Sequence, residues 1–138
     1  MKPFVIPPGG GEVFQYGEGT VEVVALPDAT GIGAFSVETF PPGFASPLHV
    51  HSRDGGVFYL LEGSIRLKCG ELDVLAQAGS TIFLPPGVPH AFKVEGDVPA
   101  RWFNVQSPSG DFIFRAMGRP FPASEGIQPL VVMGPFPE

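Results

Sequence analysis

The chain has 138 residues, of which 43% are hydrophobic and 16% charged, so it can bury one apolar core and fits one domain over residues 1–138. Its net charge of −6, with only 8 Lys and Arg residues, argues against nucleic acid as a partner, because a phosphate backbone is bound mainly by clustered cations. The single cysteine, Cys69, excludes an internal disulfide and a zinc site built from thiolates.

The start of the chain is interrupted by Pro3, Pro7 and Pro8 before an apolar segment can form. No later run approaches the ~18 apolar residues of a membrane span. We therefore expect a protein without an export signal or membrane contact, located in the cytoplasm, where a lone cysteine stays reduced.

Short segments rich in β-branched and aromatic residues alternate with turns along the chain, which contains 19 Gly and 17 Pro. Tight turns between residues 56 and 77 predict a meander of three hairpin-connected strands. The spacing is typical of a sandwich or barrel, so we expect an all-β fold. The predicted strands cover residues 20–26, 34–40, 56–61, 64–69, 71–77, 81–84, 90–94 and 100–106.

The C-terminal part carries the one helix candidate, residues 111–117, which Gly118 would end and Ser109 could cap. We expect at most this one short helix. The tail, residues 128–138, is interrupted by prolines yet apolar, which is not the composition of a solvated linker. We expect it to pack on the barrel or on a partner subunit.

The only three histidines of the chain are His49, His51 and His90. In an extended strand, alternate side chains share a face, so His49 and His51 would project together. A third imidazole could come from another strand, at the end of the proline-rich segment that precedes His90. Each histidine alone would more often be an ordinary core or surface residue, but together they predict a metal site.

Two stretches around these histidines resemble the two motifs of the cupin family. The resemblance implies a double-stranded β-helix, the cupin or jelly-roll barrel, with a core at about residues 20–106 and an extension at 107–138. In such a barrel the histidines would point inward, toward a small ligand held at the mouth. The matching positions are Gly43, His49, His51 and Gly63 in the first motif, and Gly79, Pro85, Gly87 and His90 in the second.

The chain departs from the family at two motif positions. Gly56 occupies the position of the glutamate that completes the metal shell in many cupins, and Val94 replaces the asparagine of the second motif. Glu62 would lie about 20 Å from Gly56 along a strand, so we expect it to be a turn residue. Asp54, next to the flexible Gly55, remains as a possible substitute acid. Without it, three neutral imidazoles would leave positions open for water or for an anionic, chelating substrate.

The residues around these motifs are similar to those of small quercetinase-like cupins, and a three-histidine shell resembles that of cupin dioxygenases, which use Fe(II) and O₂. The resemblance implies one divalent first-row metal ion, with Fe as first choice and Ni, Mn, Cu or Zn as alternatives. It also implies a dioxygenase-like oxidoreductase acting on a small, aromatic or enolisable, metal-chelating substrate. The alternatives are a redox-neutral isomerase, lyase or cyclase, and a cupin that binds a small molecule without catalysis. By analogy with cupins we expect a homodimer.

Three residues are candidates for the wall of a ligand pocket, namely Gly56, Phe58 and Asn104. Phe58 shares a strand face with Gly56, although most of the 13 Phe in a β protein belong to the core. Asn104 lies on a late strand with Arg101 and Gln106, where polar side chains serve either the pocket or the solvent. On the strand of Phe58, Tyr59 and Leu61 form a second apolar face, which predicts a second sheet or another subunit behind it.

Overall fold

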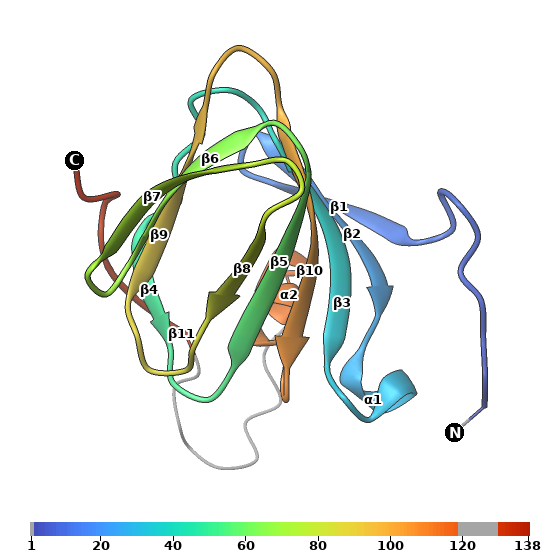
Figure 1. The fold of residues 1–138 in the computed structure, drawn as a ribbon. Helices are drawn as coiled ribbons and strands as arrows, with labels where there is room; N and C mark the ends of the chain where they lie inside the picture. The colour runs from blue at the N-terminus through green and yellow to red at the C-terminus, as the bar shows by residue number, and fades with distance from the viewer. Residues whose placement is uncertain (1, 119–129) are drawn as a thin grey trace.

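The computed structural model describes residues 2–118 and 130–138 and consists mainly of two antiparallel sheets that face each other (Figure 1). One sheet contains, in spatial order, β1 (Glu12–Tyr16), β2 (Gly19–Ala25), β3 (Ala34–Phe40), β10 (Ala100–Ser107), β5 (Gly55–Glu62) and β8 (Thr81–Leu84). The other contains β11 (Leu130–Gly134), β4 (Leu48–His51), β9 (His90–Glu95), β6 (Ser64–Cys69) and β7 (Leu72–Gln77). The all-β double-stranded β-helix predicted from the sequence is confirmed.

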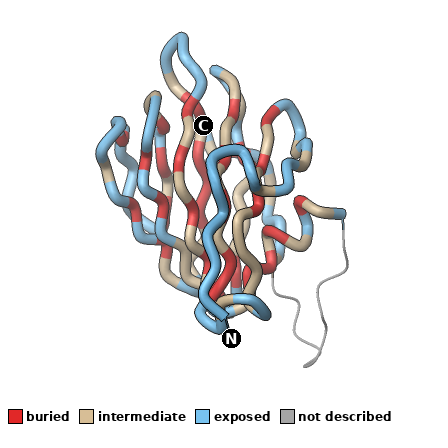
Figure 2. The backbone as a smooth tube through the Cα atoms, turned by 90° about the vertical axis from the view of Figure 1, so that its right-hand side faces the viewer, coloured by how far each residue is buried: buried red, intermediate tan, exposed pale blue. Residues whose placement is uncertain are grey.

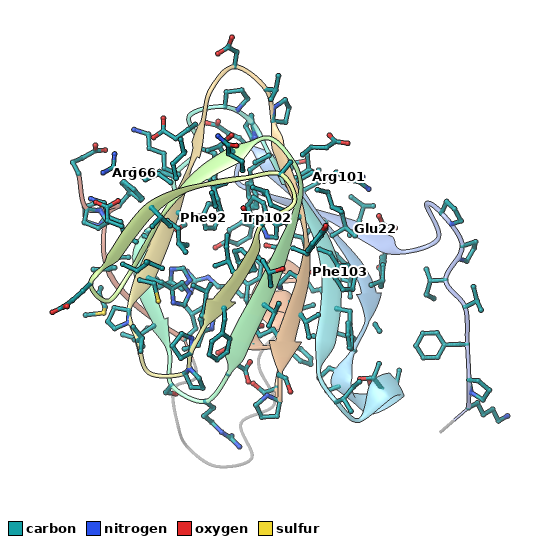
Figure 3. The ribbon with its side chains drawn as sticks, viewed as in Figure 1. Glu22, Arg66, Phe92, Arg101, Trp102 and Phe103 are labelled. Atoms are coloured by element: carbon teal, nitrogen blue, oxygen red, sulfur yellow. The ribbon has the colours of Figure 1, made fainter. Side chains whose placement is uncertain are left out.

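Buried and less buried residues alternate along the central strands, as Figure 2 shows by colour. On β10 the side chain of Trp102 points into the barrel, whereas Arg101 and Phe103 point to the opposite side of the sheet (Figure 3). Trp102 is fully buried and stacks on Phe40 and Phe58, at ring distances of 5.4 and 5.3 Å. Phe92 of the facing sheet meets it edge to face at 4.9 Å, so aromatic rings join the two sheets.

The predicted meander is wrong at its first turn. β6 and β7 form the expected hairpin, but β5 pairs with β10 and β8 in the other sheet. The chain changes sheets at Gly63, whose φ of 79° lies in the left-handed region and where a Cβ would lie 2.5 Å from the carbonyl oxygen of Pro99. Only glycine fits both conditions, and the resulting corner closes the barrel.

Two short helices occur among the described residues, one more than expected. The additional helix, α1 (Pro27–Thr30), is a single turn that begins with Pro27 and ends at Gly31, in the left-handed conformation. The predicted helix is present as α2 (Asp111–Ala116), but Ser109 does not cap it, because its N-cap residue is Gly110 and no side chain caps it there. None of the helices in the described part of the chain is long and apolar enough to cross a membrane.

Three strands lie outside the eight predicted ranges: β1, β11 and β4, of which β4 was expected to be extended only from the spacing of His49 and His51. β1 pairs with β2 at the edge of its sheet, and β11 pairs with β4, the strand that carries His49 and His51. β11 lies within the apolar tail, so this part of the tail packs on the barrel as an edge strand. The first two residues of that tail, 128 and 129, lie outside the described residues.

Candidate metal centre

The structure brings all three histidines together. β4 and β9 are neighbours, and His49 lies directly opposite His90 in their register. His51 follows His49 on the same face of β4, as strand alternation predicts. One potential ligand atom from each ring lies within 4.8 Å of the others, and His51 and His90 are buried. This cluster could therefore hold one metal ion.

Two of the rings are oriented by the backbone that precedes them. The Nδ1 of His49 lies 2.8 Å from the carbonyl oxygen of Pro47, and the Nδ1 of His90 lies 3.0 Å from that of Val88. A carbonyl oxygen can only accept, so Nδ1 donates in each case and Nε2 keeps a free lone pair. Such hydrogen bonds are the usual way in which metal-binding imidazoles are fixed.

His51 is oriented by a carboxylate. Its Nδ1 lies 2.7 Å from Oδ1 of Asp111, the first residue of α2. Gln106 donates from Nε2 to the same oxygen over 2.9 Å, and its Oε1 accepts from the amide of Phe112 over 3.1 Å. The side chains of His51, Gln106 and Asp111 are all buried, so Asp111 holds the ring and stabilises its Nδ1–H tautomer.

Asp54, the substitute acid considered from the sequence, binds the turn before α2 instead of joining the histidine cluster. It is 2% exposed, and its two oxygens accept from the amide of Ser109 over 2.7 Å, from the Ser109 hydroxyl over 2.8 Å and from the amide of Asp111 over 3.1 Å. Asp54 therefore fixes the turn that leads into α2, and through Asp111 it supports His51. Glu62 is exposed at the end of β5, as expected of a turn residue.

Burial favours the neutral form of His49 and His90. It lowers the pKa of His90 to about 4, helped by the proximity of His49, and it lowers the pKa of His49 in the same direction. Neutral imidazole is the form that binds a metal ion, so at neutral pH protons compete little for these two rings.

The histidines line a cavity of about 60 Å³ between the two sheets. The three residues predicted for a pocket, Phe58, Gly56 and Asn104, all line it, whereas Arg101 is not among its lining residues. Its walls are mainly apolar with several aromatic rings, and most polar groups that join the histidines come from the facing sheet and from α2. The aromatic residues are Tyr16, Phe40, Phe44, Phe58, Phe92 and Phe112, and the polar ones include Glu38, Asn104, Gln106 and Arg115.

Gly56 leaves its position in the wall open. A Cβ built there would lie 3.8 Å from the carbonyl oxygen of Val105 and 4.0 Å from Cβ of Leu84, which are ordinary contact distances. Packing therefore does not require glycine at the position where the resemblance to the first cupin motif implies a glutamate. The other departure, Val94, is buried in the barrel core.

Sequence reasoning missed Glu38, a second acid in the interior. It lies on the inward face of β3, is 2% exposed and lines the cavity. Its Oε2 accepts a 3.3 Å hydrogen bond from Ser36, whose hydroxyl oxygen in turn lies 3.4 Å from the Nδ2 donor of Asn104. Burial raises the pKa of Glu38 to about 8, against the opposing effects of the Ser36 hydroxyl and the Trp102 side chain.

The donor set fits a divalent first-row metal ion. Three imidazoles suit Fe, Ni, Cu and Zn, and their orientation by fixed acceptors is what a metal site requires. Three protein ligands leave further coordination positions for water or substrate, as in catalytic rather than structural sites.

Facing antiparallel sheets with an inward cluster of three histidines define a double-stranded β-helix with a candidate metal centre. The family model described as "Cupin domain" matches residues 36–106, and the chain belongs to this family. No curated protein sequence matches the chain.

Solved structures share the fold. A predicted oxalate decarboxylase from Thermotoga maritima is 20% identical, with a TM-score of 0.69 over 75% of this chain and 97% of that one. TT1209 from Thermus thermophilus is 27% identical, with a TM-score of 0.60 over 69% and 88% of the two chains. KdgF from Halomonas sp. is 16% identical, with a TM-score of 0.65 over 82% and 99%. The barrel is therefore the shared element.

Proposed function

We propose that this cupin is a mononuclear metal-dependent enzyme in which His49, His51 and His90 bind the ion. The observation that carries the proposal is that three imidazoles converge in the interior while each Nδ1 is engaged by a fixed oxygen. A histidine that only packs in the core does not need two further imidazoles beside it with their rings held in place. A metal site needs several converging imidazoles, each oriented by a hydrogen bond at Nδ1.

The cavity supports a small anionic substrate. Neutral imidazoles leave the charge of a divalent ion uncompensated, and Arg115 of α2 adds a positive charge to the wall. A cavity of 60 Å³ holds the equivalent of roughly four to six waters, which corresponds to a ligand of a few non-hydrogen atoms. The aromatic walls would shield such a ligand from solvent.

The chemistry we favour is oxygenation by a dioxygenase-like oxidoreductase with Fe, with Ni, Mn, Cu or Zn as alternatives. When bound, the ion would lower the pKa of a chelating substrate and hold the reacting groups together. A redox-neutral isomerase, lyase or cyclase reaction would use the same site, and Glu38 favours it as the second candidate because a buried acid can move protons without an oxidant. Turnover that is unchanged under anaerobic conditions would select the redox-neutral reaction.

A cupin that binds a small molecule without catalysis is the remaining alternative. In that case His49→Ala would leave ligand affinity largely intact, because the ion would not hold the ligand. A strong loss of affinity in this variant would tie binding to the metal.

The first experiment measures metal content by elemental mass spectrometry on protein purified without added metal. We expect close to one equivalent of one first-row metal per chain, and loss of that metal in the His49→Ala/His51→Ala double variant. Absence of metal from the native chain, persisting after reconstitution with each candidate ion, would overturn the enzyme proposal. Substrate screens with and without O₂ follow only if the metal is present.

The homodimer and the cytoplasmic location remain predictions. The outer face of β5 and β8 supports the homodimer, because no second sheet covers it among the described residues and its apolar side chains Val57, Tyr59, Leu61 and Phe83 are exposed. A monomeric mass in solution would contradict it.

A further inference from the structure

Glu38 is a buried acid whose place in the barrel calls for an explanation. It lies on the sheet that faces the histidine-bearing strands, with its side chain in the wall of the same cavity. The hydrogen bond that it accepts from Ser36 is long, at 3.3 Å, its other polar neighbour is the Trp102 side chain, and no ion pair joins it to a cation within the described residues. A carboxyl group buried in this way costs stability, so it is a poor structural element.

Two other carboxyl groups near the cavity and the three histidines already have hydrogen-bond partners. Oδ1 of Asp111 is held by His51 and Gln106, while its buried Oδ2 has no partner among the described residues, and Asp54 is held by Ser109 and the start of α2. Each histidine uses Nδ1 to donate to oxygen and leaves Nε2 for the ion. Within the part of the chain that the structure describes, Glu38 is thus the one carboxyl group that lines the cavity.

The surroundings of Glu38 keep it uncharged at neutral pH. The strands on either side place Val21 and Trp102 opposite it, and neither carries a charge. Burial therefore dominates, and the pKa of about 8 leaves both the acid and its conjugate base accessible near neutral pH. The titratable or charged side chains elsewhere in the cavity wall are Tyr16, His49, His51, His90 and Arg115.

We propose that Glu38 exchanges a proton with the substrate, and that the substrate is a small enolisable carboxylate. The inference rests on the proposed metal-dependent function. The Glu38 carboxylate would take a proton from the carbon next to the carbonyl group, so that the C–H bond breaks, a carboxyl O–H bond forms and the electron pair stays on the substrate as its enolate. Returning the proton reverses the step, and no oxidant is consumed.

Pyruvate and oxamate form a matched pair of probes for this step. Both are small 2-oxo carboxylates of the same charge and similar shape, but only pyruvate has an exchangeable C–H bond next to its carbonyl. Exchange of the pyruvate methyl protons for deuterium is followed by proton NMR in D₂O, with free metal in buffer as the blank. Oxamate affinity is measured by calorimetry on the same metal-loaded protein.

The test compares the native chain with Glu38→Gln, and uses Glu62→Gln as the matched control because Glu62 is an exposed glutamate outside the cavity. We expect native protein and Glu62→Gln to exchange pyruvate equally, and Glu38→Gln to be at least about 100-fold slower. Metal content and oxamate affinity should be the same in all three. A rate in Glu38→Gln within about threefold of native would overturn the role of Glu38.

A second readout does not depend on turnover. With ¹³C-labelled glutamate, the side-chain carboxyl resonance that disappears in Glu38→Gln should titrate above neutral pH, whereas that of Glu62 serves as the exposed reference. Titration of Glu38 near the ordinary glutamate range would contradict the proposal.

The outcomes separate this inference from the proposed function. Metal-loaded native protein that binds oxamate but does not exchange pyruvate would overturn the inference and leave the metal centre intact. Native protein that retains no metal and binds neither probe would overturn the metal-dependent function, and this inference with it.

Discussion

His51 and Asp111 stand 60 positions apart in the chain, yet their side chains meet in a 2.7 Å hydrogen bond inside the barrel. The pair joins β4 to the first turn of α2, so the orientation of one candidate metal ligand depends on a helix outside the barrel core. Asp54 strengthens this dependence, since its carboxylate accepts a hydrogen bond from the backbone amide of Asp111.

The first prediction concerns Asp111→Asn. The amide keeps nearly the same volume but removes the charge that favours a basic, correctly oriented imidazole at His51. We expect metal affinity to fall by about 10- to 100-fold with little change in fold, measured by competition with a chromogenic chelator. Asp28→Asn, at an exposed position of α1, is the control and should leave affinity unchanged. Equal affinities in both variants would show that His51 needs no carboxylate.

The second prediction concerns Asp54→Ala, which leaves the buried amide of Asp111 and the amide of Ser109 without their acceptor. Because hydrogen bonds to a charged acceptor are among the stronger ones, we expect a loss of about 2 to 4 kcal/mol in the free energy of unfolding. Metal affinity should also fall, since Asp111 loses its support. Urea denaturation of metal-free protein and the chelator competition measure the two effects separately. A metal affinity that stays native despite the lost stability would show that α2 does not position His51.

How far the sequence could predict this site depends on the range of each interaction. His49 and His51 could be placed on one face because strand alternation is local, and the turn residues before His90 marked the start of the next strand. Asp111 could not be linked to His51, because no local periodicity relates a residue after a loop to a strand 60 positions earlier. The sequence alone does not distinguish the corner at Gly63 from a hairpin, because both use a glycine with positive φ.

The sequence contains a signal that could have identified Glu38 as a candidate site residue. It alternates with Ser36 and Phe40 along a predicted strand, so the apolar face that carries Phe40 also had to carry an acid. A charged residue at a core position is the conflict that marks functional sites. What the sequence could not supply was the distance from β3 to the histidines, because the two sheets meet only through tertiary packing.

The third prediction is Gly56→Glu. The site accepts a Cβ without a close contact, and the new side chain would extend from the cavity wall on β5. A carboxylate at this position would add a fourth, charged ligand, so we expect metal affinity to rise by about tenfold or more. Gly56→Gln adds similar bulk without the charge and should give a smaller gain. Chelator competition compares the variants, and a loss of affinity in both would show that position 56 does not face the ion.

The fourth prediction follows from Glu38 and concerns stability against pH. Its pKa is about 8 in the folded protein against 4.5 for the ordinary group, so between these values the folded state keeps a proton that the unfolded state has released. Its contribution to stability is therefore fully present below about pH 4.5 and is lost as the pH rises through about 8. At about 1.4 kcal/mol per unit, the loss between about pH 5 and pH 7.5 is roughly 3 kcal/mol.

Glu38→Gln removes this titration. In urea denaturation of metal-free protein, the free energy of unfolding of the variant should therefore increase relative to that of the native chain as the pH rises. His90 and His49 act in the opposite direction, because the pKa of each is lowered, and for His90 stability falls as the pH falls from 6.5 to about 4. Their contribution is the same in both proteins, so it cancels in the stability difference between Glu38→Gln and the native chain. As a control, the exposed Glu62→Gln variant should show the same dependence of stability on pH as the native chain. A difference that stays constant across this range would mean that Glu38 ionises like an exposed glutamate, and that burial in the cavity wall does not hold its proton.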